Sequence, residues 1–99
     1  MEGIALASLT AAQFAERLRE TFVLAAGGLT LDLVLFEVEE LGMSRPERQA
    51  FSLQFSGPAR PVLPQAIYPI ANPAMGVIEL FLVPLGPRDG GICYQAVFT

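Results

Sequence analysis

The segment LTLDLVLFEVEEL, residues 29–41, alternates apolar and polar side chains over most of its length. Alternation with a period of two is typical of a β-strand with one buried face. The apolar positions are odd from Leu29 to Leu35 and then even at Phe36 and Val38. This change of phase predicts a β-bulge or a sharp bend, because a shift of one residue turns every side chain to the other face. We therefore expect one long strand that curls around a small core.

Shorter β-prone segments lie on both sides of it, separated by turn residues such as Gly27–Gly28. Pro69 places its segment at an edge or a bulge, because proline cannot donate to a ladder. Sequence neighbours joined by turns pair as antiparallel hairpins, so the pattern predicts a mainly β fold. We expect a six-stranded antiparallel meander curled into a small barrel or roll. The predicted strands are residues 21–26, 29–41, 50–56, 66–71, 77–85 and 92–98.

Only one segment has helical periodicity. Thr10 and Gln13 form a capping-box pattern at the start of a helix that we expect at about residues 10–20. Phe14 and Leu18 fall on its apolar face, and both are expected to anchor it. A helix this short is unstable alone, so it is predicted to cap one opening of the barrel. Residues 1–99 are interpreted as one domain.

The segment GPARPVLPQ, residues 57–65, has prolines at a spacing of three: Pro58, Pro61 and Pro64. In a polyproline II conformation these would line one ridge, and nine residues would span on the order of 28 Å. That length crosses the end of a small barrel, so we interpret residues 57–65 as a structural strap. The alternative is a binding loop of the PxxP kind, with Arg60 and Val62 on its other ridges.

Three segments together resemble a family of short bacterial proteins of unknown function. They are TAAQFAERLRETF, FSLQFSGPARPVLPQAIYPIANPAMG and ELFLVPLGPRDGGICYQAVFT, which share the family's GP-x-x-P-x-LPQ-x-x-Y segment and its LFLVP-x-G-P…Y-x-A-V-F ending. The resemblance covers nearly the whole chain. The resemblance implies no activity, but the family's association with phage-tail-collar-like genes suggests an accessory or assembly role.

Charge and residue usage argue against several classes of function. Six arginines, no lysine and ten acidic residues give a net charge of −4, and no basic stripe is present. We therefore expect neither nucleic acid nor a membrane as a partner. Without histidine the chain lacks the commonest general base and metal ligand, so no enzyme, cofactor or metal site is predicted. The lone Cys93 is expected to be inert packing.

Glu2 stands where a signal peptide would be positively charged, and no apolar run reaches the roughly 20 residues of a membrane span. The expected location is therefore the cytoplasm, with particle-associated export as the alternative.

Apolar residues make up 53% of the chain and charged residues only 16%. Such an excess predicts apolar surface that another protein chain buries, either a second copy in a homo-oligomer or another subunit. If the even positions of residues 77–83 face the core, then the odd positions face outward. The expected function is a non-catalytic interaction or assembly module, and its candidate surface consists of Phe81, Val83, Glu79, Arg60 and Val62.

Two alternatives are kept. A small barrel can hold a ligand at its mouth, which would make the protein a small-ligand carrier. A carboxylate-dependent enzyme would have to rest on the acidic cluster of Glu37, Glu39 and Glu40, which we otherwise interpret as solvated surface.

Overall fold

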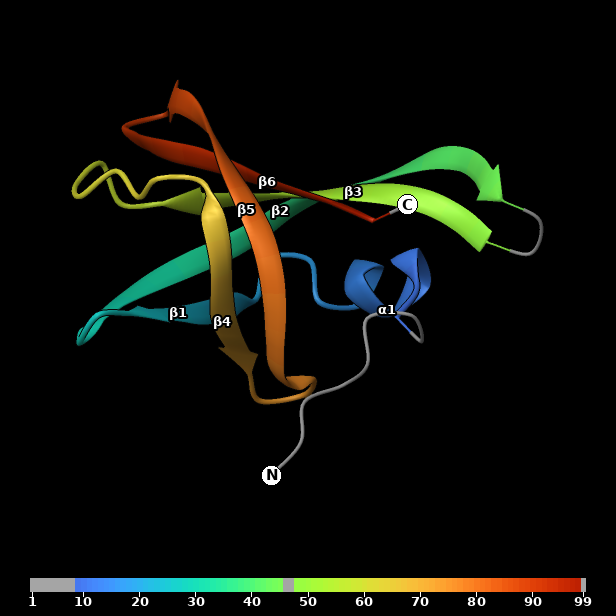
Figure 1. Ribbon diagram of the computed structural model, residues 1–99, viewed down its shortest axis with the longest axis horizontal. Helices are drawn as coiled ribbons and strands as arrows, with labels where there is room; N and C mark the ends of the chain where they lie inside the picture. Colours follow the sequence, from blue (N-terminus) through green and yellow to red (C-terminus); the bar gives the residue numbers. More distant parts are fainter. Residues whose placement is uncertain (1–8, 46–47, 99) are drawn as a thin grey trace.

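The computed structural model describes residues 9–45 and 48–98. It contains one short helix and six antiparallel strands that form a closed barrel (Figure 1). The mainly β fold predicted from the sequence is therefore confirmed. The elements are α1 (Ala11–Ala15), β1 (Thr21–Ala26), β2 (Leu29–Arg45), β3 (Arg48–Gly57), β4 (Ala66–Asn72), β5 (Gly76–Arg88) and β6 (Gly91–Phe98).

The order of strands around the barrel is β1-β2-β3-β6-β5-β4, which differs from one continuous meander. The chain forms two three-stranded meanders, β1-β2-β3 and β4-β5-β6. Two joints close the ring between them: β3 pairs with β6, and β1 pairs with β4. The long link between β3 and β4 allows this arrangement, because a tight turn would have placed those two strands side by side.

That link is the strap, which Figure 1 shows at the opposite side of the molecule from α1. Most of it is exposed, but Leu63 is buried in the core cluster. The backbone N–H of Leu63 donates to the hydroxyl oxygen of Tyr94 at 3.0 Å. At the end of the strap, the Tyr68 hydroxyl donates to the carbonyl oxygen of Pro64. The strap is thus fastened to β6 and β4 at points where buried polar groups need partners.

Large side chains fill the interior of the barrel. Five of the seven phenylalanines are buried, and Phe51 stacks on Phe98 with ring centroids 4.4 Å apart. The Phe14 ring, fully buried, lies 5.9 Å from that of Phe51 and 5.6 Å from that of Phe98. The predicted anchoring role of Phe14 is therefore confirmed, and α1 closes part of the core with this side chain and the smaller Ala11.

The helix is shorter than predicted, and the second anchor is wrong. The capping box of Thr10 and Gln13 is present, but the α-helix ends at Ala15 and Leu18 is 39% exposed. Turns follow to Arg19, whose positive φ of 75° breaks the helical path. The Arg19 N–H then donates to the carbonyl oxygen of Leu35 at 2.7 Å. Pairing with β2 therefore draws the chain away before a further helical turn forms.

The change of phase in residues 29–41 does mark a bulge. The register of β2 against β3 shifts between Leu35 and Glu37, so Leu35 is fully buried while Phe36 and Glu37 are partly exposed. Both strands run further than the sequence pattern indicated. Between the predicted strands 29–41 and 50–56, the chain extends β2 to Arg45 and begins β3 at Arg48, and Pro46 and Glu47 lie outside the described residues.

The alternation left open which face of residues 77–83 is inside, and the structure places the even positions in the core. Ile78, Leu80 and Leu82 are buried, whereas Val77, Glu79 and Phe81 are exposed. Pro69 of β4 pairs with Glu79 of β5, but the β1–β4 pairing includes only Ile70 and Ala71. At Pro69 the strand therefore behaves as an edge, and the missing N–H costs no ladder bond there.

Candidate functional site

The outer face of β1, β4 and β5 carries a group of exposed apolar side chains, which we call the outer patch. Ile67 and Phe81 are direct cross-strand partners and are 64% and 52% exposed. Val77 and Val23 both pair with Ala71, from opposite sides, and are 41% and 38% exposed. The patch thus crosses three adjacent strands, and it consists of Val23, Ile67, Val77 and Phe81.

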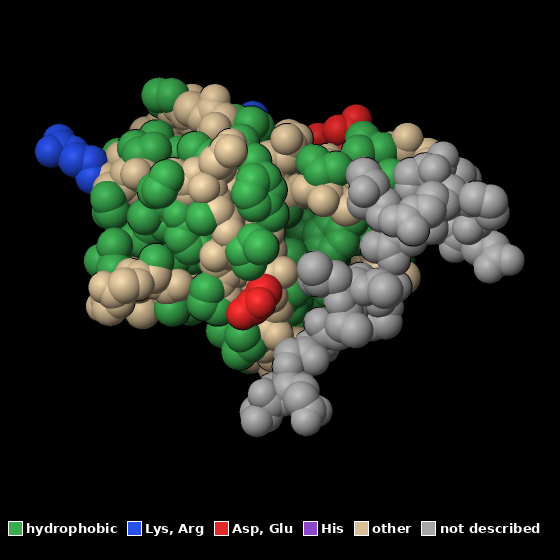
Figure 2. All heavy atoms as spheres, viewed as in Figure 1, with side chains coloured by type: hydrophobic (Ala, Val, Ile, Leu, Met, Phe, Trp, Pro, Cys, Tyr) green, Lys and Arg blue, Asp and Glu red, His purple; other side chains and the backbone are tan. Residues whose placement is uncertain are grey.

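Few charges interrupt this surface. Figure 2 shows hydrophobic side chains over most of the face that β4 and β5 present. Pro69 and Glu79 lie between the two apolar rows, since these two residues pair with each other. Glu79 is exposed, so its carboxylate stays in contact with water and needs no buried partner.

The structure brings some of the predicted surface residues together and leaves others apart. Phe81 lies in the outer patch and Glu79 beside it, whereas Val83 is half-buried and pairs with Gln95 of β6. Arg60 and Val62 are exposed on the strap, with Val62 at 55%. The strap leads into β4 just before Ile67, a patch residue that sequence reasoning did not single out. The available signal was that Ile67 lies two residues before Pro69 and therefore shares its face of the strand.

The acidic cluster lies on a different face. Glu37 pairs with Gln54 and Glu39 with Ser52, so the first two carboxylates share the outer side of β2. Glu40 pairs with Phe51 and is exposed, as is Glu39. Among the described residues, no three His, Cys, Asp or Glu side chains are grouped so that they could hold a metal ion.

Cys93 is buried, and its thiol donates to Oε1 of Gln54 at 3.5 Å. Burial raises the pKa of the Cys93 thiol, and the positive charge of Arg88 opposes this rise only in part. The neutral thiol is the weaker nucleophile, so this environment does not activate the sulfur.

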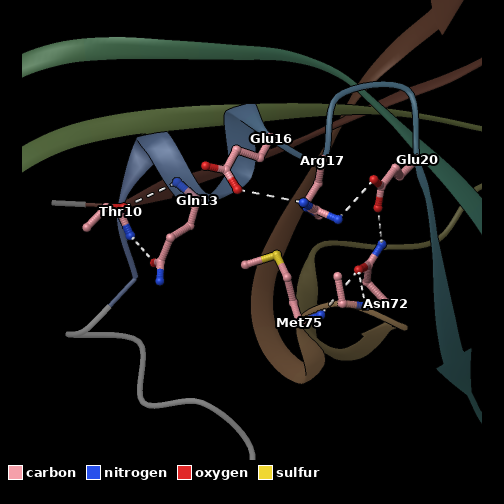
Figure 3. A network of polar contacts seen from close by, with 8 residues as sticks. Thr10, Gln13, Glu16, Arg17, Glu20, Asn72 and Met75 are labelled. Carbon is pink, nitrogen blue, oxygen red and sulfur yellow. Dashed lines mark hydrogen bonds and ion pairs between the residues drawn. The ribbon is translucent and has the colours of Figure 1, made fainter.

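A chain of polar contacts ties the helical region to the turn between β4 and β5 (Figure 3). Arg17 and Glu20 form an ion pair at 3.1 Å, and Glu20 accepts from the side-chain amide of Asn72 at 3.2 Å. Asn72 also donates to the carbonyl oxygen of Thr21 and accepts from the N–H groups of Ala74 and Met75. Because every side-chain polar atom of Asn72 has a partner, this network is a structural fastening. In the sequence, Asn72–Pro73 is a dipeptide typical of turns, and it points to the turn alone.

A hollow of about 310 Å³ lies at another place on the surface, and we call it the arginine hollow. It is lined by Arg19, Phe36, Ser56, Arg88 and Asp89. The Arg88 guanidinium carbon lies 4.5 Å from the centroid of the Phe36 ring. These residues come from four separate segments of the chain, so no motif in the sequence pointed to them.

A family model described as Domain of unknown function (DUF6916) matches residues 9–98. The match agrees with the resemblance to a family of short proteins of unknown function. No curated protein and no solved structure matches the chain. Within residues 9–45 and 48–98, no helix is long and apolar enough to cross a membrane.

Proposed function

Because the chain belongs to the DUF6916 family, whose description assigns no activity, we propose from the geometry that it is a non-catalytic interaction or assembly module that docks through the outer patch. The observation that carries the proposal is the exposure of Ile67 and Phe81 side by side on adjacent strands. Each half-exposed aliphatic or aromatic side chain gains on the order of 1 kcal/mol when another surface covers it.

The form of the patch supports docking by a protein surface. It continues across β1, β4 and β5, so it is broad and follows the curve of the barrel. Contiguous apolar patches of a few hundred Å² on soluble proteins commonly mark interaction sites. The four patch residues are uncharged, in keeping with the depletion of charged residues at interface cores, and Glu79 is the one charge between their two rows.

A second copy of the chain is the first partner that we propose. The apolar excess of the composition and the single charge among the patch rows favour self-association over capture of a charged ligand. The accessory subunit of a phage-tail-like bacterial particle, which the family resemblance suggested, is the corresponding proposal for a heterologous partner.

The two alternative functions receive less support. The barrel interior is occupied by side chains such as Phe22, Phe55 and Tyr94, each at most 1% exposed, which leaves a ligand carrier to use a surface site. For the carboxylate enzyme, Glu37 and Glu39 sit on an outer strand face beside Gln54 and Ser52. Changing both to glutamine is the direct test of any activity that is found.

Size exclusion with light scattering over a range of protein concentrations tests the proposal. We expect the native chain to form a dimer or larger oligomer, and Phe81→Asp to shift it to monomer at the same concentrations. The change places a charge where the partner surface must exclude water. Urea unfolding of Phe81→Asp, measured where both proteins are monomeric, should differ by no more than about 1 kcal/mol, because the side chain faces solvent.

Leu41→Asp is the matched control, since Leu41 is 49% exposed on β2 outside the patch. It should leave the oligomer intact. Equal loss of association in both variants would show that added charge acts non-specifically. A native monomer at every concentration would reject self-association and direct the search to a heterologous partner.

A further inference from the structure

The arginine hollow is assembled from segments that are far apart in the sequence. Arg19 comes from the turn after α1, Phe36 from the bulge of β2, and Ser56 from β3, while Arg88 and Asp89 come from the end of β5 and the turn that follows. β-Bulges often redirect a side chain beside a functional site, and here the bulge turns Phe36 outward. At about 310 Å³ the hollow reaches the lower end of the size range of small-molecule pockets.

Arg88 contacts an aromatic ring within it. Its guanidinium carbon lies 4.5 Å from the centroid of the Phe36 ring, a cation–π contact. A guanidinium carries five N–H donors, so donors remain for hydrogen bonds beside this contact. Its Nε lies 3.6 Å from Oδ2 of Asp89, too far for a good hydrogen bond, and the Asp89 side chain is 88% exposed. The Arg88 donors are therefore only weakly compensated by this neighbour.

Arg19 occupies a backbone position that suits glycine better. Its φ is 75°, and a residue with a Cβ pays about 1 kcal/mol or more to adopt that region. Asp89 also has a positive φ, but the Asp89–Gly90 pair is a common two-residue hairpin turn, so its conformation has a local reason. The Arg19 N–H donates to Leu35, next to Phe36, which places the residue at the hollow. Arg19 thus places a long cationic side chain at a position where glycine would have the lower conformational free energy.

Two of the six arginines of an acidic chain without lysine therefore line one small hollow, together with a serine hydroxyl. We propose that the arginine hollow binds a small dianion, whose oxygens accept hydrogen bonds from Arg19 and Arg88. Asp89 offsets one of the two guanidinium charges, but the two groups together offer more N–H donors than a single carboxylate can accept, which favours a group with more oxygens. A phosphate group and a small dicarboxylate both carry two negative charges and several acceptor oxygens, so either fits this description. The site is separate from the outer patch, so the proposal is independent of self-association.

Titration of ¹⁵N-labelled protein with inorganic phosphate, with succinate and with acetate tests this, at constant ionic strength set by sodium chloride. We expect saturable shifts of the Ser56 and Asp89 amide signals with phosphate, with succinate or with both, and weaker shifts with acetate. Binding by only one of the two dianions would identify the source of the negative charge. Raised chloride should weaken the binding, because the arginines are exposed to screening.

Two variants remove one guanidinium each. Arg88→Gln should weaken binding about tenfold or more, the usual effect of losing hydrogen bonds to a charged partner. Arg19→Gly should weaken it similarly while the fold becomes at least as stable, because glycine relieves the positive φ. Loss of binding together with retained stability separates a ligand contact from a structural role. Arg60→Gln is the control, because it removes the same charge from the strap outside the hollow and should bind as the native chain does.

The proposal is overturned if neither phosphate nor succinate gives saturable shifts at these amides. Acetate binding as tightly as the dianions would also overturn it, since one arginine would then be sufficient. Native-like binding by Arg19→Gly would remove that arginine from the site and contradict the proposal. A loss of affinity in Arg60→Gln as large as that in Arg88→Gln would contradict it too, because the attraction would then come from overall charge.

Discussion

The two joints that close the barrel are built in different ways. β3 and β6 pair along seven residues, from Phe51 opposite Phe98 to Gly57 opposite Ile92. β1 and β4 pair at two positions only, Val23 with Ala71 and Leu24 with Ile70. The long joint is held by backbone hydrogen bonds and by stacked aromatic rings. Two paired positions give the short joint few backbone hydrogen bonds, so its closure depends more on side-chain contacts.

Asn72 supplies much of what the short joint lacks in backbone pairing. It lies at the end of β4, is 2% exposed, and bonds to Glu20 and to the carbonyl oxygen of Thr21 at the start of β1 (Figure 3). Its side-chain oxygen also holds the turn that leads to β5. At the short joint, one fully hydrogen-bonded amide on β4 therefore reaches the start of β1 where the ladder is short.

The outer patch lies over this short joint. Val23, Ala71 and Val77 are cross-strand neighbours there, so a partner that covers the patch would bridge β1, β4 and β5. The least-paired seam of the barrel and the proposed docking surface are therefore the same region. Binding would strengthen closure by mass action, since a partner that needs the closed barrel stabilises it.

The largest effect should follow from Asn72→Ala. The change leaves the Thr21 carbonyl oxygen and the Ala74 and Met75 N–H groups without their side-chain partner, so we expect a loss of about 2–4 kcal/mol in the free energy of unfolding. Urea unfolding measures it. Hydrogen exchange should show faster opening of the Leu24 amide than of the Leu53 amide, which lies in the long joint.

Gln54→Ala is the matched control, because this amide lies in the long joint and bonds only to the Cys93 thiol in the described part of the chain. We expect it to cost less than about 1 kcal/mol. Equal losses in the two variants would contradict the view that the short joint depends on its side chains.

The sequence was sufficient to predict most of the strands, because alternation reports directly on which side of a strand is buried. Residues 21–26 were identified to the residue, whereas the alternation in residues 77–83 did not decide which of the two faces is inside. The phase change at Phe36 revealed the bulge for the same reason. The capping box and Phe14 are also local signals, and both are present.

What the sequence did not reveal depends on contacts between distant segments. The end of the helix is set by the bond from Arg19 to Leu35 rather than by a local stop signal, so Leu18 was placed on the wrong surface. The order of strands follows from where the strap lands, and proline spacing does not encode that position. The arginine hollow combines four segments, and each of its residues is ordinary in its own sequence context.

A smaller effect is expected at the long joint from Tyr94→Phe. Tyr94 pairs with Phe55 in the β3–β6 ladder, and its hydroxyl accepts from the buried N–H of Leu63 in the strap. Removing the hydroxyl leaves that N–H without its partner, and we expect a loss of about 1–2 kcal/mol in thermal or urea unfolding. The seven-residue ladder should stay closed, so the Leu53 amide should keep its slow hydrogen exchange.

Tyr68→Phe is the companion to this measurement, since it removes a hydroxyl that donates to Pro64 at the other end of the strap. That bond is only partly buried, so the change should cost less than Tyr94→Phe. A loss at Tyr94 that exceeds the loss at Asn72 would reverse the comparison and make the strap the main closure of the barrel.

The smallest effect should come from Arg17→Gln, which removes the ion pair that orients Glu20 toward Asn72. The two side chains are 26% and 40% exposed, so solvent screens the pair and we expect about 0.5 kcal/mol. In about 1 M sodium chloride the difference from the native chain should disappear, because the screening length is then about 3 Å.

The effect should also shrink when Asn72→Ala is already present, because Glu20 then has no amide left to be oriented toward. A double-mutant cycle in urea measures this coupling between Arg17 and Asn72. Strict additivity would show that Arg17 and Glu20 form an isolated surface pair, and that the short joint depends on Asn72 without help from the helical region.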